Sequence, residues 1–213
     1  MCKRIARGGE VVTHQAHNLK IGGANPSPAS KFKGELMEIK DYCKVYNVIP
    51  KNICTKIIKD YKDDSNWKEH AWYSVIDNTT EPKHNKELDI LRVGDLDYMR
   101  PYITETIGNY MKNCAGMGAV TRYSDLRLNK YSKGTIMSEH VDLIRRNQDD
   151  GVPVLSLVLV FNDNFEGGEF MMNDEEIKLK QGDILVFPST FLYRHGVKEV
   201  TKGTRYSGVS WVY

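Results

Sequence analysis

The stretch Gln181-Gly182-Asp183-Ile184-Leu185-Val186-Phe187-Pro188 decides the fold class, because a turn signal leads directly into a short apolar run that a proline ends. Similar short runs, separated by polar and glycine-containing turns, fill the second half of the chain. The expected strands are 120–131, 136–141, 153–162, 168–172, 176–180, 183–187 and 204–213. Many short strands in succession predict a mostly β fold with a double-stranded β-helix core of the jelly-roll or cupin-like type.

Two helices are expected ahead of these strands. Segment 50–60 begins at a proline and carries isoleucines and a cysteine at helical spacing. Segment 96–112 carries an apolar stripe of the kind that faces a core. We therefore expect helical support over about 50–115, packed on one face of a jelly-roll core over about 120–213.

Composition indicates the domain organisation. A chain of 213 residues with 40% apolar content suffices for one domain with its own core, which we expect over 35–213. Residues 1–34 contain six Lys or Arg and one acid, a net charge of +5, so the remainder carries +2 minus 5, or −3. This segment has no apolar period and predicts a flexible basic extension, for which solvation is favoured over binding to an acidic partner.

The residues His140, Asp142 and His195 supply the donor set of a metal centre. Side chains at i and i+2 of a strand point to the same face, so the first two can converge on one ion, while His195 arrives from another strand. Two imidazoles and a carboxylate on one face of iron(II) leave positions for a bidentate co-substrate and dioxygen, unlike a closed four-ligand zinc site. The alternative role for Asp142 is a strand-end cap.

An arginine follows ten residues after the second histidine: Arg205 shares a strand face with Ser207. A guanidinium donates two parallel hydrogen bonds to a carboxylate, which suits the distal end of a keto-diacid whose other end chelates the metal. The alternative role for Arg205 is a surface salt bridge of little energetic value. That alternative does not explain why the arginine and the three metal donors occur at this spacing.

A family resemblance rests on the segments 129–142, 154–161, 166–170, 182–188 and 195–211. From about Val120 to the C-terminus, roughly 90 of 213 residues, the chain resembles the iron(II)- and 2-oxoglutarate-dependent dioxygenases, most closely their prolyl 4-hydroxylase-like branch. The resemblance implies iron(II) ligands His140, Asp142 and His195, and 2-oxoglutarate contacts Arg205, Ser207 and Tyr131. For Tyr131, the role of an ordinary buried aromatic is an equal alternative. No catalytic residue beyond these is implied.

The resemblance also implies an activity. Oxygen from O2 would enter an unactivated C–H bond, preferably of a prolyl residue in a peptide or protein, with release of succinate and CO2 and with ascorbate admitted as a reductant. Asp142 favours hydroxylation, because halogenating relatives replace this carboxylate with a small residue. Trp211 stands where base demethylases carry a second arginine, so nucleic acid is disfavoured as a partner. A non-catalytic metal-binding jelly roll, or a dioxygenase acting on a nucleic acid or small molecule, are the alternatives.

Several further expectations concern loops and location. Segments 67–86 and 143–151 are expected to be polar loops that contact substrate, His70 to be solvated, and Trp211 to pack in the core. No run approaches the roughly 20 apolar residues of a membrane helix, and no signal peptide is evident, which predicts a soluble cytoplasmic protein. The four cysteines show neither a close pair nor zinc-like spacing, and a reducing compartment suits iron(II). The sequence assigns no oligomeric state.

Overall fold

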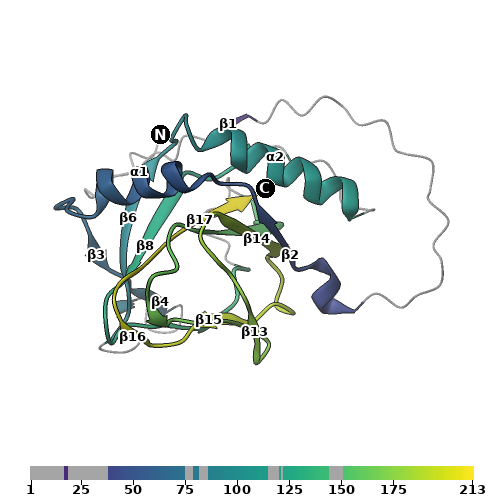
Figure 1. Ribbon diagram of the computed structural model, residues 1–213. Helices are drawn as coiled ribbons and strands as arrows, with labels where there is room; N and C mark the ends of the chain where they lie inside the picture. The colour runs from purple at the N-terminus through teal and green to yellow at the C-terminus, as the bar shows by residue number, and fades with distance from the viewer. Residues whose placement is uncertain are drawn as a thin grey trace, which may run out of the picture.

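The computed structural model of the protein has three layers: two helices, a large sheet and a small sheet (Figure 1). The structure describes residues 17–18, 38–74, 79–81, 86–114, 120, 122–143 and 151–213. Strands predominate over helices in this part of the chain. The expected mostly β class with flanking helices is confirmed.

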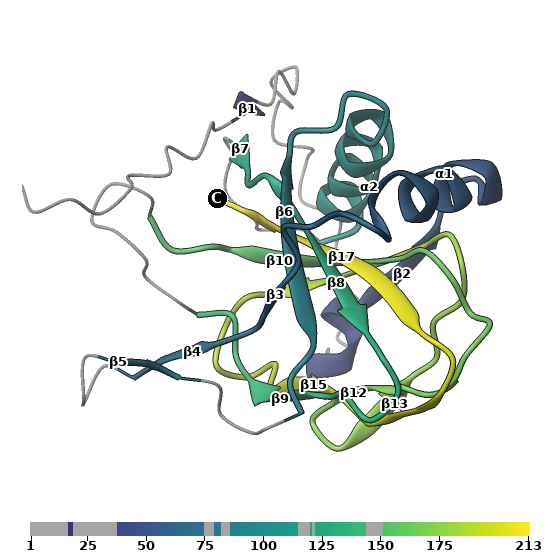
Figure 2. The same cartoon turned by 90° about the vertical axis from the view of Figure 1, so that its left-hand side faces the viewer.

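Two α-helices cover one face of the large sheet (Figure 2). Helix α1 (Lys51–Tyr61) begins after Pro50, and α2 (Arg100–Asn113) has a proline in its first turn, where a backbone N–H has no intrahelical partner in any case. Each helix buries one stripe, represented by Ile57 and Ile107, against the sheet. Both expected helices are confirmed. A short 3-10 helix, η1 (Ile39–Tyr42), precedes the first strand of the large sheet.

The large sheet is antiparallel, and its C-terminal strand lies in the middle. Its order is β2 (Lys44–Asn47), β14 (Asp183–Pro188), β10 (Leu155–Val160), β17 (Arg205–Val212), β8 (Leu126–Tyr131), β6 (Asp89–Gly94) and β3 (Lys68–Glu69). The short strand β7 (Arg122–Tyr123) pairs with the end of β17, and β1 (His17–Asn18) pairs with β7. Because β17 pairs with β10 on one side and β8 on the other, both of its edges are satisfied by hydrogen bonds.

The small sheet lies across the inner face of the large one (Figure 2). Its order is β13 (Glu175–Ile177), β12 (Phe170–Met172), β15 (His195–Val197) and β9 (Met137–His140). Two strand pairs lie outside both sheets: β11 (Glu166–Gly167) with β16 (Val200–Lys202), and β4 (Trp72–Ser74) with β5 (Thr79–Glu81). Two facing antiparallel sheets are the jelly-roll arrangement.

Alternation along the central strands builds two separate cores. In β10, Leu157 and Leu159 pack with the helices, whereas Val158 between them packs toward the small sheet. In β14, Val186 belongs to the helix-side core and Phe187 to the core between the sheets. Period-two side-chain direction explains this division, and burial on both faces explains why these strands are apolar almost throughout. The core between the sheets is the one that borders the site.

The structure departs from the expected strands in several places. Segment 120–131 contains two strands, and segment 67–86, expected to be a loop, contains β3, β4 and β5. Strands β2 and β6 were not predicted, because β2 is short and partly exposed, and β6 finds its partner β8 only beyond an intervening helix. Apart from β1, the predicted extension 1–34 lies outside the described residues.

Among the helices of the described residues, none is both long enough and apolar enough to cross a membrane.

Candidate metal and co-substrate site

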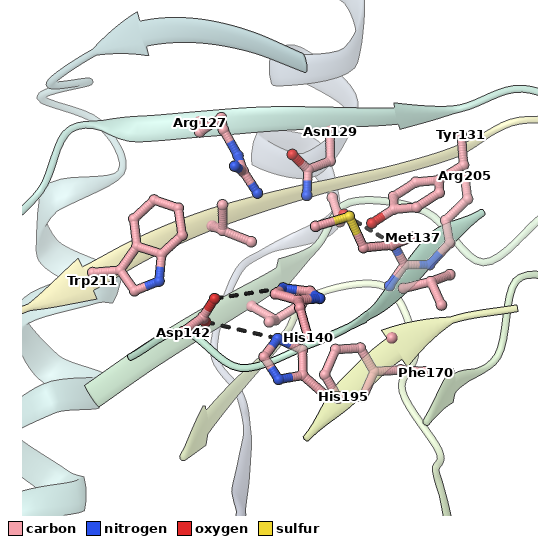
Figure 3. A pocket seen from close by; sticks show the side chains of 15 residues that line it. Arg127, Asn129, Tyr131, Met137, His140, Asp142, Phe170, His195, Arg205 and Trp211 are labelled. Atoms are coloured by element: carbon pink, nitrogen blue, oxygen red, sulfur yellow. Dashed lines mark hydrogen bonds and ion pairs between the residues drawn. The ribbon is translucent and has the colours of Figure 1, made fainter. Parts of the chain in front are cut away.

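A pocket lies between the inner faces of the two sheets (Figure 3). Its described lining residues are Arg127, Asn129, Tyr131, Met137, His140, Asp142, Val158, Phe170, His195, Gly196, Val197, Arg205, Ser207, Val209 and Trp211. All six residues that the sequence proposes for the site are in this group. Alternate residues of β8 and of β17 face the pocket, as a pleated strand requires.

Three of these side chains converge on one point. Possible ligand atoms of His140, Asp142 and His195 all lie within 4.8 Å of one another. The Nε2 atom of His140 is 3.5 Å from Oδ1 of Asp142, and Nε2 of His195 is 3.7 Å from Oδ2 of the same carboxylate. Adjacent donors at about 2.1 Å from one ion stand roughly 3 Å apart. The observed separations therefore suit a metal ion after small adjustments.

A β-bulge in β9 directs His140 into the pocket. His195 pairs with His140 and Val197 pairs with Met137, so β9 has one residue more than β15 between these pairs. Strand β9 ends at His140, and Asp142 follows it in irregular backbone. The expectation that His140 and Asp142 converge therefore holds, although Asp142 is not itself a strand residue.

Backbone carbonyls orient both imidazole rings. Nδ1 of His140 lies 2.9 Å from the carbonyl oxygen of Ser138, and Nδ1 of His195 lies 2.9 Å from that of Tyr193. A carbonyl can only accept a hydrogen bond, so each Nδ1 is the donor and each Nε2 keeps its lone pair for a metal. The His195 ring is also stacked on Phe170, with ring centroids 5.5 Å apart. Both rings are thus oriented without an ion.

Burial and mutual charge set the ionisation of the triad. Burial by itself would raise the pKa of Asp142, but in acid the protonated rings of His140 and His195 favour the carboxylate through a hydrogen bond and their charge, so the pKa is lowered and the carboxylate is ionised at neutral pH. Burial lowers the pKa of His195 to about 4, although the charge of Asp142 acts in the opposite direction. At neutral pH His195 is therefore a neutral imidazole, the form that binds metals.

The low pKa of His195 predicts how the metal-free protein responds to acid. The unfolded chain takes up this proton near pH 6.5 and the folded protein only near 4, so the free energy of unfolding should fall by about 2 kcal/mol between pH 7 and 5. The lowered pKa of Asp142 adds stability that is lost only at lower pH. Urea unfolding in the presence of a chelator measures the effect, and His195→Gln should remove this part of the slope. Parallel pH profiles for the wild type and the variant would contradict the assignment.

Arg205 also lines the pocket, at the start of β17, whereas Trp211 lies near the end of the same strand (Figure 3). It is only 2% exposed, its Nη1 donates a 2.9 Å hydrogen bond to Oγ of Ser207, and its guanidinium carbon lies 4.9 Å from the Tyr131 ring centroid. Burial lowers the pKa of Arg205. Arg205 forms no ion pair with any acid in the described part of the chain. A buried guanidinium of this kind is expected to meet an anionic ligand.

Tyr131 lies beside Arg205 on the same wall of the pocket. It is opposite Arg205 in the register of β8 and β17 and is 2% exposed. Burial raises the pKa of Tyr131. The charge of Arg205 and hydrogen bonds with Asn129 and Ser207 act in the opposite direction but are weaker. Its hydroxyl is therefore protonated at neutral pH and can donate a hydrogen bond within this network.

The Gly167-Gly168 pair has a structural explanation. Both residues have positive φ, 73° and 66°, which glycine adopts without strain. A Cβ on Gly167 would come within 2.2 Å of the carbonyl oxygen of Glu199, and one on Gly168 would lie 3.2 Å from Cδ of Arg205. The pair thus lets β11 approach the next strand and leaves room for the Arg205 side chain.

Sequence reasoning missed two polar residues of the pocket, Arg127 and Asn129. They precede Tyr131 by four and two residues in β8, so strand alternation could have placed them on the same face. Trp211, expected in the core, is buried but lines the pocket beneath Arg127. Trp211 is on the same face of β17 as Arg205 and Ser207, so strand alternation explains its place in the pocket.

The expected substrate loops are only partly described. Trp72, in β4, lies edge-on to His140 with ring centroids 5.1 Å apart, so this segment does reach the triad. His70 was expected to be solvated, which is wrong: it is 7% exposed and lies against Trp72. In the second expected loop, residues 144–150 lie outside the described residues.

A family model described as the 2OG-Fe(II) oxygenase superfamily matches residues 126–213, from β8 to the last residue given. This range contains all six of the proposed site residues.

Curated relatives are named PKHD-type hydroxylases. One from Stenotrophomonas maltophilia is 37% identical over 100 residues, which are 43% of this chain and 44% of that protein. Another from Prochlorococcus marinus is 29% identical over 157 residues, 71% of this chain and 68% of that protein. The chain thus spans less than half the length of the Stenotrophomonas relative that it matches.

Solved structures share the fold. A Trichoplax adhaerens prolyl hydroxylase, in complex with a hypoxia inducible factor oxygen degradation domain peptide fragment, superposes with a TM-score of 0.62 at 16% identity, covering 81% of this chain and 83% of that one. A Pseudomonas putida prolyl-4-hydroxylase gives a TM-score of 0.61 at 16% identity, covering 80% and 91%.

Proposed function

We propose that the chain is an iron(II)- and 2-oxoglutarate-dependent hydroxylase of a prolyl residue in a peptide or protein, because the model of the 2OG-Fe(II) oxygenase superfamily matches residues 126–213. One observation carries the proposal: the pocket that holds the His140, Asp142 and His195 donors also holds Arg205, buried without an acidic partner in the described chain. A metal triad and a buried guanidinium together suit a chelating keto-diacid.

The residues present fit both groups. In the proposal, His140 and His195 bind iron(II) through Nε2 and Asp142 through its ionised carboxylate. Arg205 and Ser207 hold the distal carboxylate of 2-oxoglutarate. When bound, these groups and O2 supply the oxidation, in which one oxygen atom enters the substrate C–H bond and the other enters succinate as CO2 is released.

The chain itself contributes positioning and exclusion of water. Carbonyl acceptors fix both imidazole rings, and the buried lining holds Arg205 in one orientation through its bond to Ser207. Tyr131 donates its hydroxyl proton toward the co-substrate from the same wall. A buried, low-dielectric site strengthens each of these charge-assisted contacts.

The substrate assignment is supported by the relatives. Those that match in sequence are named hydroxylases, and a structural neighbour was solved with a peptide fragment bound. We further propose residues 35–213 as one catalytic domain and 1–34 as an extension, with a cytoplasmic location and ascorbate as an auxiliary reductant.

Succinate formation tests the proposal. With iron(II), 2-oxoglutarate and O2, proline-containing peptides are expected to raise succinate release at least tenfold over the uncoupled rate, with matching hydroxyproline formation by mass spectrometry. Matched peptides with alanine in place of proline are the control. If only nucleic acid or free amino acids stimulate succinate release, the assignment of a prolyl substrate is wrong. If the protein consumes no 2-oxoglutarate under any condition, a non-catalytic metal-binding jelly roll is the better account.

A further inference from the structure

The bulge that directs His140 into the pocket lies at an edge of the small sheet (Figure 2). Strand β9 pairs with β15 on one side, and no strand of the described chain pairs with Met137–His140 on the other. A bulge also leaves one residue without a partner in the ladder. Backbone pairing alone is therefore too sparse to hold this part of β9 in one conformation.

On the side of β15, the bulge rests against a glycine. Gly196 lies between the paired residues His195 and Val197, and a Cβ on it would come within 2.8 Å of the carbonyl oxygen of Met137. Real Cβ atoms do not approach a backbone oxygen so closely. The glycine thus lets the bulge lie directly on β15.

On the other side, the segment before β6 supports the chain just ahead of the bulge. Ile136 donates a 2.8 Å backbone hydrogen bond to Lys86 and accepts one of 3.2 Å from Leu88. Glu87, between these two, forms a parallel bridge with Ile136. In the described part of the chain this pairing does not continue along β9, so it fixes the residue before the strand but not the bulge itself.

A side-chain contact reaches the bulge. Oγ of Ser138 donates a 2.5 Å hydrogen bond to Oε1 of Glu87, and the two residues are 8% and 4% exposed. The backbone carbonyl of the same serine accepts the hydrogen bond from Nδ1 of His140. Ser138 therefore connects the buried Glu87 carboxyl group to the imidazole ring.

The Glu87 carboxyl group is unfavourable for the stability of the protein. Its second oxygen, Oε2, has no hydrogen-bond partner in the part of the chain that the structure describes. A buried polar atom without a partner destabilises the folded state, and an apolar side chain of similar size would avoid this. Such exceptions are expected near functional sites, where geometry matters more than stability.

We propose that Glu87 is a positioning residue for the iron(II) site: through Ser138 it holds the β9 bulge so that Nε2 of His140 stays directed at the metal position. Glu87 is not among the described residues that line the pocket, so it acts only through its neighbour. Partners of this kind orient a histidine ligand before the metal arrives. The inference rests on the proposed function for the presence of iron(II).

Three single variants test the contact. Glu87→Met and Ser138→Ala each remove it, and each should lower the affinity for iron(II) by about 10- to 100-fold. Glu87→Gln keeps an acceptor for the serine hydroxyl and should stay within about threefold of the wild type. Iron(II) alone is titrated anaerobically against a fluorescent metal indicator. In the metal-free protein, ¹⁵N NMR of labelled histidines should show that the Nδ1–H signal of His140 shifts in the first two variants and not in the third.

The double variant Glu87→Met/Ser138→Ala separates positioning from ordinary packing. Ser138→Ala alone leaves Oε1 of Glu87 buried without its donor, so the metal-free protein should melt at a lower temperature. Replacing both partners by apolar groups removes that penalty, so the double variant should regain the melting temperature of the wild type while its iron(II) affinity stays low. A contact that serves only stability would restore affinity and melting temperature together.

Glu139→Gln is the matched control. Glu139 is next to His140, but its side chain is exposed and lies 3.6 Å from Arg194, so iron(II) affinity should be unaltered. Wild-type affinity in Glu87→Met overturns the inference alone, as does recovery of affinity in the double variant. If Glu87→Met does not fold, Ser138→Ala takes its place in this comparison. Failure of the wild type to bind iron(II) overturns the proposed function first.

Discussion

Asp142→Asn is expected to lower the affinity for iron(II) at least 100-fold and to reduce turnover below detection. The variant keeps the shape of the side chain but removes the negative charge that two buried histidines surround at 3.5 and 3.7 Å. Changes in residues that merely support metal ligands already lower affinity by about 10–100-fold, so loss of a ligand charge should exceed that range. Anaerobic titration with iron(II) and 2-oxoglutarate, followed by the visible charge-transfer band, measures the effect.

Asp60→Asn is the matched control. Asp60 lies on α1, on the opposite face of the large sheet, and pairs with Lys56 at the surface. The same charge change there should leave the band and the iron(II) affinity unchanged, because exposed pairs contribute little. His140→Ala should lose the band as Asp142→Asn does. A normal band in Asp142→Asn would exclude this carboxylate as a ligand.

Arg205→Gln is expected to raise the dissociation constant of 2-oxoglutarate by about 100- to 4,000-fold while iron(II) still binds. Removing one partner of a buried charge pair is unfavourable by about 3–5 kcal/mol, which corresponds to this range. The metal-free variant should be no less stable than the wild type, since burial of Arg205 without an acidic partner in the described chain disfavours its charge.

Two further variants sharpen this test. Arg205→Lys should recover part of the affinity, because an ammonium keeps the charge but loses the two parallel hydrogen bonds. Arg100→Gln, which changes an arginine at the start of α2 that pairs with Asp95 and Asp97, should leave 2-oxoglutarate binding unaltered. Calorimetric titration of iron-loaded protein provides the constants. Unchanged 2-oxoglutarate affinity in Arg205→Gln would place the distal carboxylate elsewhere.

Much of the architecture was predictable because its signals are local. The apolar runs around Leu157 and Leu185 are buried on both faces, and the stripe that includes Ile107 has helical spacing. The edge strand β2 was not predictable. Its side chains are partly exposed, and its partner β14 is distant in the sequence.

The sequence by itself determined the donor types and their order, His140, Asp142 and His195, and it placed Arg205 and Ser207 on one face of the last strand. These follow from residue chemistry and from the period of two along a strand. Only the tertiary structure decided that a bulge directs His140 into the pocket, that Trp72 reaches the triad, and that Arg127 stacks on Trp211. Such contacts depend on strand register and on the packing of one sheet over another, which join residues far apart in the chain and leave no local signal.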